Sequence, residues 1–194
     1  KWKKGSRYYY NHLENFISFL VPENKRVIEI GCGTGDLLFK LKSSYGLGVD
    51  ISEKMIELAR QKSSNPKIEF KTGTIDDIDG LFDYVILSDL IGYLPDIEEF
   101  FRKLSKITHS QSRIIITQYS QLWEPVLNLA SSAGLRMPAP FVQNWISLQD
   151  INNFLRLTGL ETVRSGKKLL FPKNIPLVSK IINNYLINLW PLNK

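Results

Sequence analysis

The chain contains few of the residue types on which several classes of protein depend. Its single cysteine, Cys32, allows no disulfide within the chain, which agrees with a reducing cytoplasm. Its two histidines are far apart, and we expect His12 to pack in a first helix and His109 to lie on the surface. No apolar run is long enough to span a membrane, and no apolar signal core follows the basic start. We therefore expect a cytoplasmic protein without a secretory signal.

Length and composition suit a single globular domain. The chain has 194 residues, of which 43% are hydrophobic and 23% charged, enough for one sizeable core. Residues 1–101 carry slightly more acidic than basic side chains, whereas residues 102–194 are strongly basic. The basic half could attract nucleic acid, an anionic membrane or a phosphorylated substrate, or it could be a solvated surface, because its positive charges are scattered.

The most informative stretch is residues 26–36, which read RVIEIGCGTGD. A β-rich apolar segment runs into Gly31, Gly33 and Gly35, and helix-forming residues follow at 37–39. The pattern predicts a strand, a tight turn and a helix N-terminus, whose free N–H groups and positive dipole suit an anionic ligand. The alternative is a glycine turn that merely joins strand to helix.

An acid nineteen residues after the first glycine gives independent support for a ligand. Asp50 ends a second apolar run, residues 45–49, and a carboxylate at the tip of the neighbouring strand can accept both hydroxyls of a ribose. Dinucleotide folds have a glycine at the sixth position of G-x-G-x-x-G, where this chain has Asp36, an acid that would repel a pyrophosphate. The loop therefore favours a nucleoside ligand without a pyrophosphate.

The segment EIGCGTG, residues 29–35, resembles motif I of the class I S-adenosylmethionine (SAM) dependent methyltransferases. Residues 49–60 resemble the family's second strand tip and helix, residues 68–78 its third strand and adenine loop, and residues 82–90 its fourth strand. The resemblance covers roughly residues 7–120. It implies SAM as the cofactor and a doubly wound α/β fold, in which a mostly parallel sheet lies within a three-layer αβα sandwich.

The resemblance also implies which residues meet the cofactor. The backbone at Thr74 and Ile75 and an acid, Asp76 or Asp77, would meet adenine, and Arg7 would pair with the SAM carboxylate. No metal site is expected. The full set of expected cofactor-binding residues is Arg7, Glu29, Gly31, Cys32, Gly33, Gly35, Asp50, Ile51, Thr74, Ile75, Asp76 and Ser88.

The tip of the fourth strand carries the acceptor site in this family. Methyl transfer mainly requires that the acceptor be held in line with the methyl group and, for a hydroxyl, that its proton be removed. Asp89 is the candidate base or acceptor anchor, and Tyr93, where related enzymes often have histidine, is a candidate for an orienting hydrogen bond. Residues 88–91 lack the prolines and aromatic residue of a pocket that stacks a flipped base, which disfavours a nucleic-acid acceptor.

Other elements follow from apolar periodicity and capping residues. An apolar stripe predicts a helix over residues 7–20, which would be a lid over the cofactor if it resembles the family's. Residues 175–190 predict an amphipathic helix that either packs on the protein or rests on an anionic membrane. The remaining expectations are a helix over 96–107, a strand over 113–119, a helix over 122–133, a loop over 134–140, a helix from 147 closed by Gly159, and strands over 160–165 and 168–171.

Three functions from different classes remain open. The first is methyl transfer from SAM to a small-molecule or glycan-linked acceptor, because residues 144–177 also resemble methyltransferase modules of bacterial surface-polysaccharide pathways. The second is a SAM-binding regulatory or scaffold module without turnover, and the third is an NAD-dependent oxidoreductase. We expect one domain over residues 1–194, in a natural chain that continues further, and a sugar or lipid-linked acceptor reached in the cytoplasm or at the inner face of the membrane.

Overall fold

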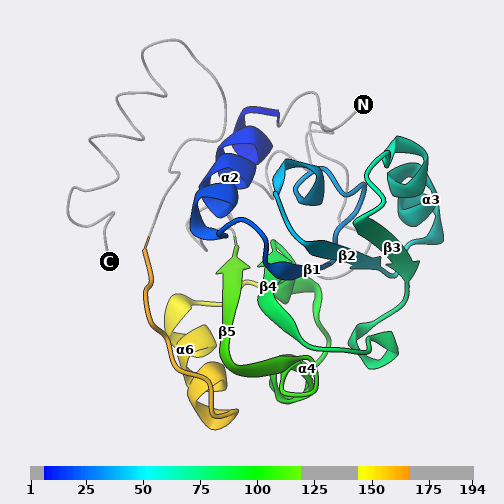
Figure 1. Cartoon of the computed structure of the whole chain (residues 1–194). Helices are drawn as coiled ribbons and strands as arrows, with labels where there is room; N and C mark the ends of the chain where they lie inside the picture. Colours follow the sequence, from blue (N-terminus) through cyan, green and yellow to red (C-terminus); the bar gives the residue numbers. More distant parts are fainter. Residues whose placement is uncertain (1–6, 119–143, 167–194) are drawn as a thin grey trace. The chain divides into compact units, whose positions relative to one another are not determined.

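The structure is a computed structural model that describes residues 7–118 and 144–166 (Figure 1). The chain divides into two compact units, one of residues 18–161 and one of residues 1–17 and 162–194. The helices and strands are α2 (Arg7–Leu20), β1 (Arg26–Ile30), η1 (Leu38–Lys40), β2 (Tyr45–Asp50), α3 (Glu53–Lys62), β3 (Ile68–Thr72), η2 (Ile75–Asp77), β4 (Phe82–Ser88), η3 (Ile91–Tyr93), α4 (Ile97–Leu104), β5 (Thr108–Thr117) and α6 (Leu148–Leu157), where η marks a short 3₁₀ helix.

The five strands form one parallel sheet in the order β3-β2-β1-β4-β5. Connections from β1 lead outward to β2 and β3, and the chain then returns to β4 on the other side of β1. The order therefore reverses between β1 and β4, and open α/β sheets bind ligands outside the carboxyl ends of the strands at such a point. With helices flanking this sheet, the predicted doubly wound α/β fold is confirmed.

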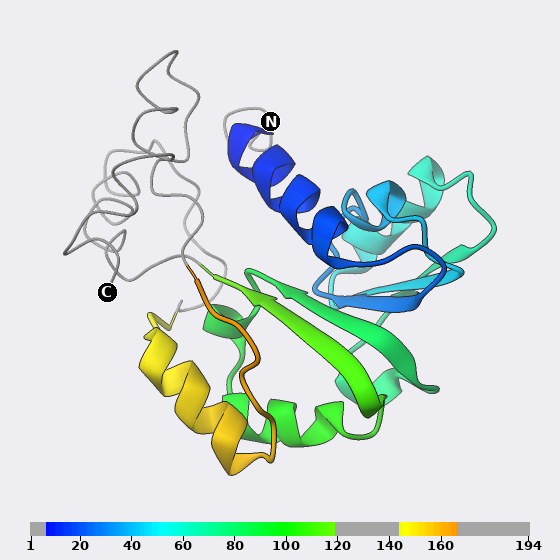
Figure 2. The same cartoon turned by 60° about the vertical axis from the view of Figure 1, so that its left-hand side comes forward.

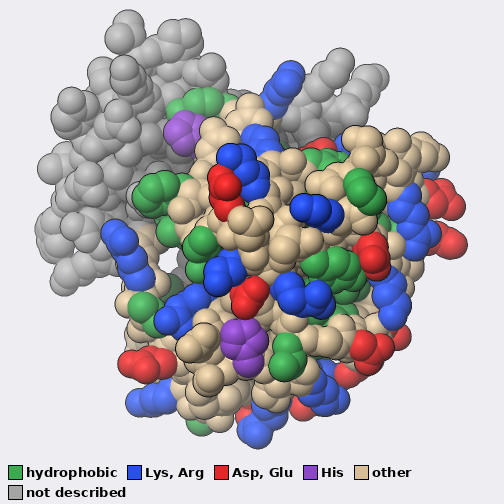
Figure 3. All heavy atoms as spheres, in the orientation of Figure 1, with side chains coloured by type: hydrophobic (Ala, Val, Ile, Leu, Met, Phe, Trp, Pro, Cys, Tyr) green, Lys and Arg blue, Asp and Glu red, His purple; other side chains and the backbone are tan. Residues whose placement is uncertain are grey.

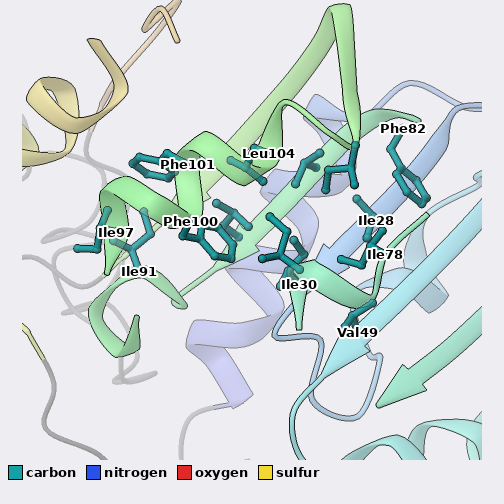
Figure 4. Close-up of a cluster of buried hydrophobic side chains, with 14 of the residues drawn as sticks. Ile28, Ile30, Val49, Ile78, Phe82, Ile91, Ile97, Phe100, Phe101 and Leu104 are labelled. Atoms are coloured by element: carbon teal, nitrogen blue, oxygen red, sulfur yellow. The ribbon is translucent and has the colours of Figure 1, made fainter. Parts of the chain in front are cut away.

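One face of the sheet is buried under α4 and α6 (Figures 1, 2 and 4). Helix α4 buries Ile97, Phe100, Phe101 and Leu104, a spacing of three, four and seven residues that places them on one face of the helix. Figure 4 shows these side chains in one buried cluster with Ile28 and Ile30 of β1. The apolar pattern of residues 97–104 thus predicts both the helix and its buried face.

Capping residues mark the start of α4 and both ends of α6. The Asp96 carboxylate accepts the Glu99 N–H at 2.9 Å and starts α4. Ser147 and Asp150 form a capping box at the start of α6, and Gly159 takes φ +76° just after its end. The predicted limits of α6 are confirmed, whereas the helix predicted over 96–107 ends at Leu104.

Three predictions about local structure are wrong or need adjustment. No α-helix follows the glycine loop, where the structure has only η1, because the fourteen residues between Ile30 and Tyr45 must hold both the loop and the return to β2. Residues 160–165 form no strand, because no ladder partner pairs with them in the described part of the chain. Strand β5 is longer than predicted and irregular near its start, opposite Phe82 and Tyr84.

The remaining structural expectations concern helix α2, residues that the structure does not describe, and membrane or metal-binding features. Helix α2 has the bounds predicted for the first helix, while its lid role stays a prediction. The helices over 122–133 and 175–190, the loop over 134–140 and the strand over 168–171 lie outside the described residues. Within the described ranges, no helix combines the length and apolar character needed to cross a membrane, and no group of His, Cys, Asp and Glu side chains could hold a metal ion.

Candidate functional site

The glycine loop after β1 is held by the end of β2. The N–H groups of Gly31 and Cys32 both donate to the Val49 carbonyl, at 2.7 and 3.1 Å. Gly31, Gly33 and Gly35 take φ values of +78°, +54° and +74°, a left-handed backbone that side chains with a Cβ rarely adopt. Every second residue of this loop therefore has a left-handed backbone, and these positions require glycine.

The surroundings of the three glycines differ. A Cβ on Gly31 would lie 3.0 Å from Leu90 Cδ1, and one on Gly35 only 2.4 Å from Cζ of Phe70 on β3. A Cβ on Gly33 would meet no atom within 4 Å. Gly35 thus makes room for a buried aromatic ring, whereas Gly33 borders open space that a ligand can enter.

Asp50 joins three loops at the carboxyl edge of the sheet. Its Oδ2 accepts the Gly33 N–H at 2.8 Å, its Oδ1 accepts the Ser52 N–H at 2.9 Å, and its backbone carbonyl accepts the Gly73 N–H at 3.0 Å. Each carboxylate oxygen keeps a lone pair for another donor. The carboxylate is therefore placed to hold the loop and to accept ligand hydroxyls, and the adjacent Ile51 side chain is 64% exposed.

Asp36 has partners that the sequence did not indicate. Its Oδ2 accepts from Thr34 Oγ1 at 2.8 Å, and its Oδ1 pairs with Nζ of Lys62, at the end of α3, at 3.0 Å. Because the Lys62 ammonium partly neutralises this carboxylate, its repulsion of a pyrophosphate is weaker than the sequence suggests. The stronger argument against a pyrophosphate is that no α-helix follows the loop. The three residues of η1 supply no substantial dipole to hold such a group.

The loop after β3 is shaped by a capping box at η2. The Asp77 carboxylate accepts the Thr74 N–H at 2.7 Å and the Thr74 hydroxyl at 3.1 Å, and Thr74 Oγ1 accepts the Asp76 N–H at 3.3 Å. The Thr74 backbone N–H is the main cause that lowers the pKa of Asp77. The capping box uses the N–H groups of Thr74 and Asp76, and it does not use the N–H of Ile75, which lies between them in the sequence.

The two neighbouring acids of η2 have separate partners. Asp77 is engaged by the capping box, and a Cβ on Gly73 would lie 2.7 Å from its Oδ2, so glycine is required beside it. Asp76 Oδ2 pairs instead with Nζ of Lys103, in the last turn of α4, at 2.7 Å. The hydrogen bond to Asp76 is the main cause that raises the pKa of Lys103. Of the two acids, Asp76 is the one whose carboxylate the capping box leaves to a ligand.

The tip of β4 has a strained backbone. Asp89 takes φ +52°, and its N–H donates to the backbone carbonyl and to Oγ1 of Thr117, at 3.0 and 3.3 Å. Thr117 Oγ1 also lies 3.5 Å from Asp89 Oδ1. A non-glycine residue in this region is uncommon, and such strain tends to occur at functional sites. Tyr93 follows in η3, half-buried, with its N–H donating to the Leu90 carbonyl at 2.9 Å.

Contacts among these loops bring most of the predicted residues to one edge. Loops after β1, β2 and β3 meet at Asp50, and Leu90 after β4 lies against Gly31. Glu29 is the exception within the sheet, because it is a buried residue of β1 at 4% exposure. Arg7 belongs to the other compact unit and is described only as the first residue of α2.

Sequence reasoning missed Thr117, Lys62 and Lys103. Thr117 pairs with Ser88 in the ladder between β4 and β5, so the register of the sheet would have identified it. The two lysines reach the site from the last turns of α3 and α4, and no motif marks them. Their proximity to Asp36 and Asp76 depends on how the helices pack.

Comparisons with known proteins agree with this arrangement. A family model described as a methyltransferase domain matches residues 22–155. The ribosomal protein L11 methyltransferase of Thermotoga neapolitana is 31% identical over 112 residues, which are 53% of this chain and 40% of the relative. The ubiquinone biosynthesis O-methyltransferase of Bartonella quintana is 23% identical over 87% of this chain and 69% of its own.

A solved structure from Thermotoga maritima, described as a SAM-dependent methyltransferase and possible histamine N-methyltransferase, superposes with a TM-score of 0.71. It is 22% identical, and the match covers 90% of this chain and 83% of that one. At this identity the likeness concerns the fold. The chain spans less than half the length of the ribosomal protein L11 methyltransferase.

Proposed function

Because this chain belongs to the family of class I SAM-dependent methyltransferase domains, we propose that it transfers the methyl group of SAM to a small-molecule acceptor. The observation that carries the proposal is the Asp50 carboxylate, which holds the Gly33 N–H beside the open space at Gly33. A ligand with a ribose and a slender amino-acid chain suits this combination. SAM, when bound, supplies a methyl group on a sulfonium, which is already a strong electrophile.

The residues at the carboxyl edge suit the parts of SAM. Asp50 accepts the ribose hydroxyls while it keeps the glycine loop in place, and the exposed Ile51 side chain covers one face of the base. The Ile75 N–H and the Asp76 carboxylate meet the edge of the adenine. The wall beside the methionine part is formed or supported by Gly31, Cys32, Gly33, Gly35, Glu29 and Ser88.

Asp89 and Tyr93 act on the acceptor. Asp89 stands at the tip of β4, where Thr117 holds its backbone amide, and its carboxylate takes the proton of an acceptor hydroxyl or anchors the acceptor. Tyr93 donates a hydrogen bond that orients the acceptor. Neither role requires a metal ion.

We favour a small molecule, glycan-linked acceptors included, over a nucleic acid. One relative is named as a ubiquinone biosynthesis O-methyltransferase. The face seen in Figure 3 carries basic and acidic side chains interspersed, without the single-sign patch that attracts nucleic acid. A lipid-linked acceptor would bring the protein to the inner face of the cytoplasmic membrane. The amphipathic segment 175–190, which is flanked by Lys167, Lys168, Lys173 and Lys194, would then rest on anionic lipid.

Cofactor binding and turnover are tested separately. Isothermal titration of the full chain with S-adenosylhomocysteine (SAH) and with NADH should show binding of SAH alone, and NADH binding would refute the proposal. Turnover is then sought with methyl-labelled SAM and two acceptor panels, quinols and phenols in one, nucleotide sugars and polyprenyl-linked sugars in the other. Tight SAH binding without transfer to either panel would favour the SAM-binding module without turnover.

A further inference from the structure

Two acids follow each other in η2, and their different partners separate their roles. The Asp77 carboxylate is engaged by Thr74 and is the structural acid of the turn. The Asp76 carboxylate forms its ion pair through Oδ2 alone, with Nζ of Lys103 at 2.7 Å. Asp76 therefore has an oxygen, Oδ1, that neither the capping box nor this ion pair uses.

Lys103 is well placed to restrict the Asp76 side chain. Its own side chain is only 25% exposed, whereas that of Asp76 is 51% exposed. Lys103 belongs to the last turn of α4, whose Phe101 and Leu104 are among the most buried side chains, so the lysine extends from a firmly packed helix. Glu99, one turn earlier, lies 3.8 Å from the same ammonium and gives it a second carboxylate neighbour.

We propose that Lys103 is a positioning residue for base recognition, which holds the Asp76 carboxylate so that Oδ1 accepts the exocyclic amino group of the adenine. This inference rests on the proposed function. An exposed aspartate samples several rotamers, and a side chain already held in place loses less entropy when a ligand binds.

The effect of Lys103 should depend on the chemistry of the base. In 6-deamino-SAH, the purine riboside analogue, a hydrogen atom replaces the amino group of SAH, so this analogue cannot donate to Asp76 while its N1 remains an acceptor. Fixing the carboxylate therefore helps SAH and does not help the deamino analogue. A lysine that only stabilised the fold would change the affinity for both ligands alike.

Isothermal titration of the full chain with both ligands tests the proposal. Lys103→Met should weaken SAH binding about three- to tenfold and leave the affinity for 6-deamino-SAH within about twofold. Lys103→Arg should restore SAH affinity. Lys106→Met is the matched control, because Lys106 is an exposed lysine beyond the end of α4. In an Asp76→Asn background, Lys103→Met should have no further effect on SAH.

The outcomes separate the inference from the function on which it rests. If the unaltered chain binds no SAH, the proposed function fails and the inference fails with it. If SAH binds and Lys103→Met leaves its affinity unchanged, raises it, or weakens both ligands equally, only the inference is overturned. Thermal unfolding of each variant shows whether the chain remains folded, and Lys103→Arg provides a second variant if Lys103→Met does not fold.

Discussion

Alanine at Gly33 and at Gly35 should have different consequences, although both residues belong to one loop and both have positive φ. A Cβ at Gly33 enters open space, so the cost to the fold is the left-handed backbone alone, about 1 to 2 kcal/mol. A Cβ at Gly35 also meets Phe70 Cζ at 2.4 Å, and overpacking a core adds about 1 to 3 kcal/mol. Gly35→Ala should therefore cost the fold roughly twice as much free energy of unfolding as Gly33→Ala.

Gly48→Ala isolates the packing part of this difference. A Cβ there would lie 2.5 Å from Phe70 Cδ1, and Gly48 has no positive φ. Its cost should be overpacking alone, about 1 to 3 kcal/mol. Because all three variants replace glycine by alanine, the entropy change of the unfolded chain, about 0.4 to 1 kcal/mol, cancels in the comparison.

Urea and thermal unfolding measure the effect on stability, and titration with SAH measures the effect on binding. Gly33→Ala should lower the melting temperature by about 2 to 8 °C while weakening SAH at least about tenfold, because its methyl group occupies ligand space. Phe70→Leu removes the ring atoms nearest to Gly35 and should recover about 1 to 3 kcal/mol of the Gly35→Ala cost in a double-mutant cycle. Equal losses of stability for Gly33→Ala and Gly35→Ala, or no coupling to Phe70, would refute the argument.

Three further predictions concern single side chains. Asp50→Ala should weaken SAH binding about 10- to 100-fold, since it removes the acceptor of the ribose hydroxyls and releases the Gly33 N–H. An unchanged SAH affinity in a folded variant would count against the ribose assignment. The Arg26 backbone N–H donates to the Asp83 carboxylate at 2.8 Å and is the main cause that lowers the pKa of Asp83. This carboxylate therefore stabilises the fold above about pH 4, and its contribution disappears as the pH falls through the lowered pKa. Asp83→Asn should accordingly destabilise at pH 7 and much less at pH 2.5, and a deficit of equal size at both values would contradict this. Ser147→Ala should cost about 1 kcal/mol in urea unfolding through the lost cap of α6, with Ser147→Asp close to the unaltered chain.

Local patterns in the sequence were sufficient for most helices and strands. The apolar spacing of residues 97–104 predicts α4 and its buried face, and Ser147, Asp150 and Gly159 mark the limits of α6. These signals act within a few residues of the chain, so they can be read without knowing the fold. The glycine loop and Asp50 were likewise found from spacing, because both belong to the ends of neighbouring parallel strands.

Other features depended on contacts between distant parts of the chain. The reason for glycine at 35 is the ring of Phe70, which only the pairing of β2 with β3 brings beneath the loop. The helix predicted after the loop is replaced by η1, because the return to β2 leaves too few residues for it.

The sequence by itself determined the strand ends, the capping residues and the loop that form the candidate site. Only the tertiary structure decided which charged groups meet there. The pairing of Asp76 with Lys103 spans 27 positions and that of Asp36 with Lys62 spans 26, and each depends on the last turn of a packed helix reaching a strand tip. Such contacts arise from packing over the whole sheet, which leaves no repeating pattern along the chain.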